Sequence, residues 1–144
     1  MSSTLTPQDA LIAVMATTSA ADERMSALEL LTISRIIDSL PVFEGYDDQR
    51  MRRTLEAVAD MLGAEEGLET IVGLAKEALP EEFYETAYAL ACDVVAADGH
   101  VHISEMRWLD LLRENLSVGR LTAAAIERAA RARHLRLPAS KGGA

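Results

Sequence analysis

The sequence predicts an all-helical bundle of about seven helices. Three observations point to this fold class: residues that start and stop helices recur along the chain, apolar residues repeat every three to four positions, and strand signals are nearly absent. The composition agrees, because the chain is rich in Ala and Leu while only 4% of its residues are aromatic. For a chain of 144 residues we expect a single domain that spans 1–144.

The first helix is predicted to begin at Thr6 and Pro7. Thr is a good N-cap residue, and Pro suits the first helical position, where no backbone N–H is needed. Asp9 lies three residues after Thr6, which is the spacing of a capping box. Apolar residues then recur at helical spacing as far as Thr18, so the segment has both the start signal and the periodicity of a helix.

The other six helices are bounded by the same kinds of signal, namely capping residues, glycines and prolines. They are expected at about 26–40, 48–62, 65–79, 81–97, 104–116 and 122–137. Gly67 and Gly73 are expected to weaken the helix that contains them, because glycine lowers helix propensity. A loop is expected at 41–48 and a disordered tail at 138–144.

Two stretches of the chain repeat each other. SAADERMSALE (19–29) and VAADGHVHISE (95–105) share Ala-Ala-Asp, and in both a Glu follows the Asp by seven residues. Apolar positions on either side correspond at the same offset of 76 residues. We therefore predict two related helix–loop–helix halves, at about 5–40 and 81–116, that pack face to face around an approximate twofold axis.

Each half contributes two candidate site residues, Asp22 and Glu29 in the first and Asp98 and Glu105 in the second. Helical periodicity places each Asp at the end of an apolar stripe and each Glu at the start of the next one. All four carboxylates are therefore expected to point inward at one mouth of the bundle. Burying carboxylates is costly unless they are protonated, hydrogen-bonded or neutralised.

A divalent cation with oxygen ligands would neutralise these four carboxylates, so they are candidate ligands for Ca²⁺, Mg²⁺ or Zn²⁺. The stretch DGHVHISE matches the later half of a calcium-loop signature, and Gly99 suits the positive φ of such a turn. The first half of the signature is missing, because its ligand positions fall on Val94 and Ala96. Any site must therefore draw ligands from both halves and is not a true EF-hand.

The alternative is a hydrogen-bonded structural cluster without a metal. Ser26 and Glu29 have the spacing of a capping box, in which the Glu bonds the backbone at the helix start. In the second half the corresponding position before Glu105 is His102, which is a poor cap. Capping therefore explains Glu29 better than Glu105, and both interpretations remain open.

The chain carries four short stretches that resemble one known family: TPQDALIAVM, AADERMSALE, LPVF and AADGHVHISE. Through them, over about residues 5–117, it resembles the TerB-like family of bacterial tellurite-resistance and stress proteins. The resemblance implies a small helical bundle with two related halves, and a non-enzymatic role as a cytoplasmic partner in a membrane-linked stress response. It also implies an acidic cluster suspected of binding metal, which matches the four carboxylates. Glu23 stands where the family often has Gly, which disfavours a left-handed turn in the first loop.

Charge is unevenly distributed along the chain. Residues 1–106 hold 6 Lys+Arg and 20 Asp+Glu, whereas residues 107–144 hold 8 and 3. The basic helix at about 122–137 is expected to dock on the acidic body, and we expect no nucleic-acid partner, because no aromatic residues are interleaved with its arginines. Attachment to an anionic membrane is a further alternative. A metal-free adaptor is the alternative function, with this helix or the 41–48 loop contacting a protein partner.

The remaining features exclude more than they identify. No nucleophile-elbow, zinc-protease or phosphate-loop motif is present, so we expect no enzymatic activity. No basic leader or long apolar run occurs, so we expect a cytoplasmic protein without a transmembrane segment. Trp108 and the single cysteine, Cys92, are expected in the core. The same is expected of five methionines at helical spacing: Met15, Met25, Met51, Met61 and Met106.

Overall fold

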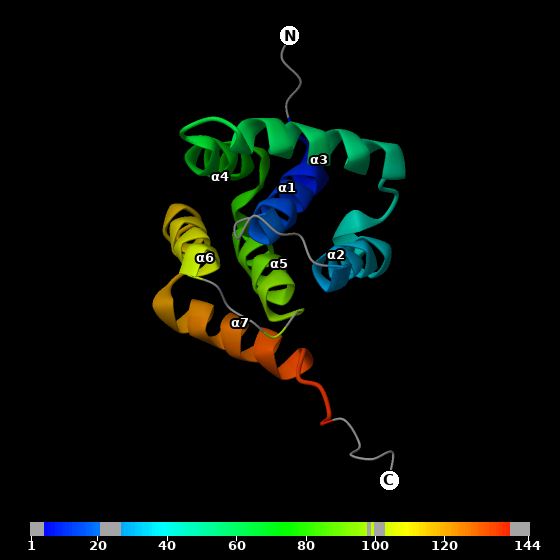
Figure 1. The fold of residues 1–144 in the computed structure, drawn as a ribbon. Helices are drawn as coiled ribbons and strands as arrows, with labels where there is room; N and C mark the ends of the chain where they lie inside the picture. Colours follow the sequence, from blue (N-terminus) through cyan, green and yellow to red (C-terminus); the bar gives the residue numbers. More distant parts are fainter. Residues whose placement is uncertain (1–4, 21–26, 98, 100–102, 139–144) are drawn as a thin grey trace.

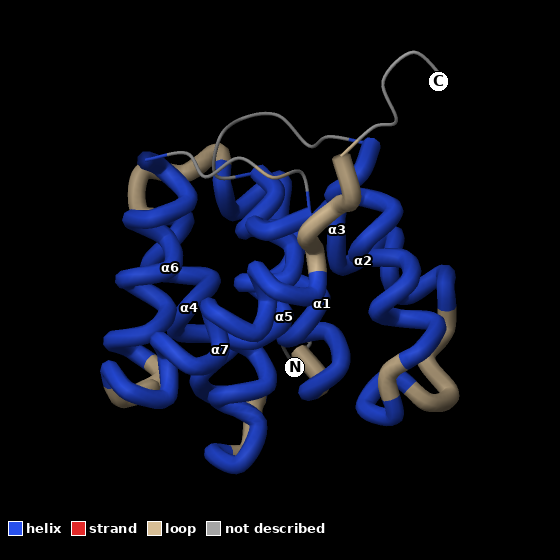
Figure 2. The backbone as a smooth tube through the Cα atoms, turned by 90° about the horizontal axis from the view of Figure 1, so that it is seen from below, coloured by secondary structure: helices blue, strands red, loops and turns tan. Residues whose placement is uncertain are grey.

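A computed structural model describes residues 5–20, 27–97, 99 and 103–138 of the chain. Within these residues the structure is entirely helical, with seven α-helices, two short 3-10 helices and no strand (Figure 2). The elements are α1 (Pro7–Ala20), α2 (Ala27–Ser39), η1 (Pro41–Phe43), α3 (Asp48–Leu62), α4 (Gly67–Ala78), η2 (Glu81–Phe83), α5 (Tyr84–Ala97), α6 (Ile103–Asn115) and α7 (Arg120–Arg133). The predicted all-helical fold class is confirmed.

Two helices form the centre of the molecule. Figure 1 shows α1 and α5 side by side, with α3 and α4 across one end, α2 and α6 on opposite sides, and α7 across the other end. Every residue of α1 from Asp9 to Ser19 is buried. A helix covered on all sides must be apolar around its whole circumference, which accounts for the sequence ALIAVMA in its middle. The core therefore forms around α1.

The capping signals read from the sequence are present in the structure. The backbone N–H of Asp9 donates to Oγ1 of Thr6 at 3.1 Å, and the backbone N–H of Thr6 donates to Oδ2 of Asp9 at 3.2 Å, which completes the predicted capping box. Helix α3 has the predicted bounds, and Asp47 caps it by accepting from the backbone N–H of Gln49. Local signals thus determined these helix starts.

Three predicted boundaries were wrong. The helix predicted from 81 starts as the 3-10 helix η2, and the predicted loop at 41–48 opens with the 3-10 helix η1. The basic helix spans Arg120–Arg133 instead of 122–137. It ends where the backbone N–H of His134 bonds to the carbonyls of both Ala130 and Arg131, and Arg136 beyond it reaches another helix. The predicted tail lies outside the described residues except for its first residue, Pro138.

The helix pairs agree with the sequence repeat. Helices α2 and α6 have 13 residues each, and a shift of α2 by 76 residues gives the bounds of α6. Helices α1 and α5 have 14 residues each and differ by 77 residues. The offset found in the sequence is therefore also the offset of the helices themselves.

Gly67 lies at the start of α4, where that helix meets the end of α3. A Cβ atom at this position would collide with the carbonyl oxygen of Met61 and lie 2.9 Å from the Cα of Leu62. These are backbone atoms and cannot rotate away. Gly67 therefore does not weaken α4, as the sequence analysis expected, but permits its close approach to α3.

Replacing Gly67 with Ala is expected to lower the free energy of unfolding by about 2 kcal/mol, because the two helices must move apart. Gly73 provides the matched control, since a Cβ there meets nothing within 4 Å. Gly73→Ala is expected to raise stability by about 0.5–1 kcal/mol through helix propensity. Urea denaturation of both variants measures the difference, and equal midpoints would contradict the close approach.

Candidate functional site

Two of the four predicted site residues lie in the described part of the chain, and both are buried. Glu29 is in the first turn of α2 and Glu105 is in the first turn of α6, and each is 0% exposed. Both point inward, as their apolar stripes predict. Asp22 and Asp98 lie outside the described residues, as do Ser26, His100 and His102.

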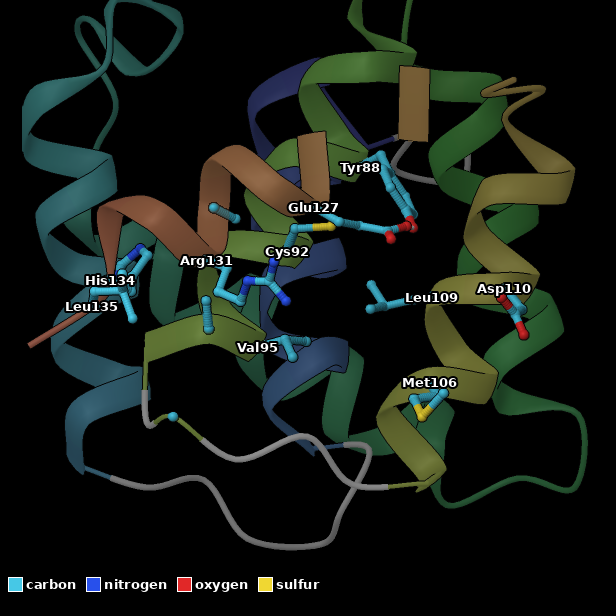
Figure 3. Close-up of a pocket in the computed structure, with 13 residues that line it drawn as sticks. Tyr88, Cys92, Val95, Met106, Leu109, Asp110, Glu127, Arg131, His134 and Leu135 are labelled. Atoms are coloured by element: carbon cyan, nitrogen blue, oxygen red, sulfur yellow. Dashed lines mark hydrogen bonds between the residues drawn. The ribbon is translucent and has the colours of Figure 1, made fainter. Parts of the chain in front are cut away.

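The helix ends that carry these residues lie together. Figure 3 shows the ends of α1 and α5 and the starts of α2 and α6 at the same end of the molecule. Gly99, the described residue after α5, has a φ of 78°, the positive value that the calcium-loop comparison requires. The topology therefore places the two halves' corresponding loops at one end of the bundle.

A buried hydrogen bond joins the two halves at this end. Nε1–H of Trp108 on α6 donates to Oγ1 of Thr18 on α1 at 2.8 Å, and Oγ1–H of Thr18 donates to the carbonyl oxygen of Val14 at 2.7 Å. Trp108 and Thr18 are both fully buried. Because Trp108 lies three residues after Glu105 on the same face of α6, this bond holds the start of α6 against the last turn of α1.

The last turn of α1 is polar although it is buried. Thr17, Thr18 and Ser19 are each 0% exposed. The hydroxyl of Thr18 is bonded in both directions, whereas the hydroxyls of Thr17 and Ser19 have no hydrogen-bond partner within the part of the chain that the structure describes. A core that was only structural would favour apolar residues here, because a buried hydroxyl without a partner is costly.

Within the described residues, no group of three or more His, Cys, Asp and Glu side chains is arranged to hold a metal ion. Glu29 and Glu105 alone are two oxygen-donor side chains, and a Ca²⁺ or Mg²⁺ site takes six or more ligands, several of which can be water. The predicted set of four ligands, Asp22, Glu29, Asp98 and Glu105, therefore remains a prediction.

A second polar cluster, which the sequence analysis missed, surrounds Asp9. Its carboxylate accepts from Nη2 of Arg50 at 2.5 Å, from Nε of Arg50 at 3.1 Å and from the hydroxyl of Tyr46 at 3.0 Å. Burial alone would raise the pKa of Asp9, but the hydrogen bonds from Arg50, Thr6 and Tyr46 outweigh it and lower the pKa to about 2. This cluster fastens the start of α1 to α3 and has a structural role.

The third feature is a cavity of about 490 Å³ between α5, α6 and α7 (Figure 3). The hydroxyl of Tyr88 donates to Oε2 of Glu127 at 2.5 Å beside it, and burial and then this bond raise the pKa of Tyr88. Cys92 is buried as predicted, and burial followed by the charge of Glu127 raises the pKa of its thiol to about 12. The thiol therefore stays protonated at neutral pH and is neither a nucleophile nor a metal ligand.

Met106 lines this cavity and corrects one prediction. It was expected in the core, but it is 55% exposed. The buried face of α6 passes through Glu105, Trp108 and Leu112, and Met106 is rotated about 100° away from Glu105 around the helix. Met15 is fully buried, Met51 and Met61 pack partly buried against the core, and Met25 lies outside the described residues.

The basic helix docks on the acidic body, as the charge distribution predicted. Nη2 of Arg133 lies 2.5 Å from Oδ1 of Asp93 on α5, with Nε2 of His134 at 3.3 Å from the same oxygen. Nη2 of Arg136 donates to the carbonyl oxygen of Ala97, the last residue of α5, at 2.8 Å. A cation at a helix C-terminus is favoured by the helix dipole.

No family model, curated protein or solved structure matches the chain in the comparisons with known proteins. Among the described helices, none has both the length and the apolar character needed to cross a bilayer.

Proposed function

We propose that the chain is a non-enzymatic, TerB-like protein that binds a divalent cation at the shared end of its two helix–loop–helix halves. In this proposal Asp22, Glu29, Asp98 and Glu105 supply the protein ligands, and the protein acts as a cytoplasmic partner in a tellurite or stress response. The single observation that carries it is the complete burial of Glu29 and Glu105 at corresponding positions of α2 and α6.

The energetic argument starts from that burial. An ionised carboxylate loses its hydration when it enters the core, and two at one end of a bundle also disfavour each other's ionisation. A divalent cation offsets both costs, and hard carboxylate oxygens are the ligands that Ca²⁺ and Mg²⁺ prefer. The buried hydroxyls of Thr17 and Ser19 are consistent with a polar centre at this end of α1.

The proposal is tested by replacing Glu29 and Glu105 together with Gln. Wild-type protein freed of metal is expected to bind one of Ca²⁺, Mg²⁺ or Zn²⁺ in calorimetric titration, and 100-fold excess over Kd should raise its unfolding free energy by about 2.7 kcal/mol. The double variant is expected to lose this increase, because an amide is a weaker ligand and carries no charge.

Glu69→Gln is the matched control, since Glu69 is also an acid in the first turn of a helix but is exposed. It should retain the full cation effect. If no cation stabilises the wild type, or if the double variant responds as the wild type does, the cation site is wrong. A loss of stability in the metal-free double variant, without any cation effect in the wild type, would instead indicate the hydrogen-bonded structural cluster.

The second candidate is a metal-free adaptor, and exposed apolar residues favour it. Leu121, Leu135 and Leu137, in and after α7, are 86%, 76% and 94% exposed, which is unusual for large apolar side chains. The arginines Arg133 and Arg136 are engaged with α5, so a partner would contact the leucines instead. An adaptor predicts that cations leave the melting temperature unchanged.

A further inference from the structure

The cavity between α5, α6 and α7 has the size and lining of a small-molecule site. Its volume of about 490 Å³ lies within the usual range for such sites, roughly 300–1,000 Å³. Most of its wall is apolar, with Val95 and Ala96 from α5, Leu109 from α6, Ala130 from α7 and Leu135 beyond it. The cavity is separate from the carboxylates of the proposed cation site, since neither Glu29 nor Glu105 lines it.

The polar groups of this cavity are arranged unevenly. Glu127 and Arg131 are four residues apart on α7, a spacing at which Glu and Arg normally pair. Here Glu127 is turned away to accept from the hydroxyl of Tyr88. Figure 3 shows the Arg131 side chain directed over the cavity, and it forms no ion pair within the part of the chain that the structure describes. Asp110 lies on the opposite rim and points away from Arg131 (Figure 3).

This arrangement leaves a guanidinium group beside an apolar cavity without an anion to pair with. A guanidinium group binds a carboxylate through two parallel hydrogen bonds, and water is largely excluded where the walls are apolar. The one acid within reach along its own helix, Glu127, is occupied by Tyr88. The missing partner is therefore an anion that brings its own apolar body.

We propose that this cavity binds a small amphipathic monocarboxylate, such as a medium-chain fatty acid. The alkyl chain lies against Val95 and Leu109, and the carboxylate pairs with Arg131. Burial of the chain supplies most of the affinity, in proportion to the apolar area removed from water. Binding is non-covalent, because the thiol of Cys92 beside the cavity stays protonated at neutral pH.

Three probes with the same chain and different head groups test the proposal: decanoate, decanol and decyltrimethylammonium, titrated below micelle formation. Decanoate is expected to bind most tightly to the wild type. Arg131→Gln should weaken decanoate binding about tenfold and leave decanol unchanged, since a charge-assisted hydrogen bond is lost only for the anion. Arg128→Gln is the matched control, because Arg128 is on the same helix but does not line the cavity.

A second variant tests the cavity itself. Ala96 is half-buried and lines the wall, so Ala96→Leu should fill part of the space and weaken decanoate and decanol alike. The proposal is overturned if decanoate does not bind, if the cationic probe binds more tightly, or if Arg131→Gln and Arg128→Gln have equal effects. Because cation titration depends on Glu29 and Glu105, failure here is distinguishable from failure of the proposed function.

Discussion

Replacing Trp108 with Ala is expected to lower the free energy of unfolding by about 4 kcal/mol, the largest effect of any single substitution considered for this chain. Trp108 is 0% exposed, so the substitution removes a large ring from the core and leaves a cavity between α6 and α1. It also removes the 2.8 Å hydrogen bond to Thr18 that joins the two halves. Chemical denaturation followed by far-UV circular dichroism measures the loss.

Two further variants separate packing from hydrogen bonding. Thr18→Val keeps the volume but leaves the buried Nε1–H of Trp108 without its acceptor, which is expected to cost about 1–3 kcal/mol. Arg107→Ala, at an exposed position of the same helix, should change stability by less than about 0.5 kcal/mol. If Thr18→Val unfolds at the wild-type midpoint, the bond between the halves contributes nothing to stability.

Replacing Asp9 with Ala is expected to lower the free energy of unfolding at pH 7 by about 3 kcal/mol. Loss of the capping box accounts for about 1 kcal/mol of this. The remainder, about 2 kcal/mol, follows from the lowered pKa of the carboxyl group, which falls from 3.8 in the unfolded chain to about 2 in the folded protein. It is nearer 2 than the cost of breaking a fully buried pair, because the Arg50 side chain is 42% exposed.

The same shift predicts how acid affects stability. A carboxyl group with a lowered folded-state pKa contributes stability above its unfolded pKa and loses it as the pH falls through the folded one. The contribution of Asp9 is therefore complete above pH 5 and disappears between about pH 4 and pH 2. The wild type should lose about 2 kcal/mol more than Asp9→Ala over this range.

Asp60→Ala, at an exposed position of α3, is the control for this acid effect. It should follow the wild-type acid profile at every pH. Parallel profiles for the wild type and Asp9→Ala would show that Asp9 does not act through its lowered pKa. Both proteins are compared by urea denaturation at pH 7, 5, 4, 3 and about 2.

The local signals of the sequence predicted single helices well. Thr6 and Asp9 form the expected capping box, and α3 begins and ends where Asp48 and Gly63 predicted. The repeat predicted the burial of Glu29 and Glu105, because helical periodicity alone relates each Glu to the apolar stripe that follows it. Their role as ligands depends on residues that the structure does not describe, and so stays a prediction.

Other features had a signal in the sequence but no partner that the sequence could name. Gly67 looked like a weakness in α4 until the backbone of α3 was seen against it. Glu127 and Arg131 have the spacing of a helical salt bridge, but the hydroxyl of Tyr88 on α5 competes for the Glu. Met106 belongs to an apolar run, but the rotation of α6 places it outside the core.

The sequence by itself determined the all-helical class, most helix starts, the repeat and the docking of a basic helix on an acidic body. These follow from caps, periodicity and charge, which act over a few residues or over the chain as a whole. Only the tertiary structure decided that Asp9 pairs with Arg50, that Trp108 donates to Thr18 across 90 residues, and that a cavity opens beside Arg131. Such contacts depend on how helices distant in sequence rotate and pack against one another, and residue spacing within one helix carries no record of that.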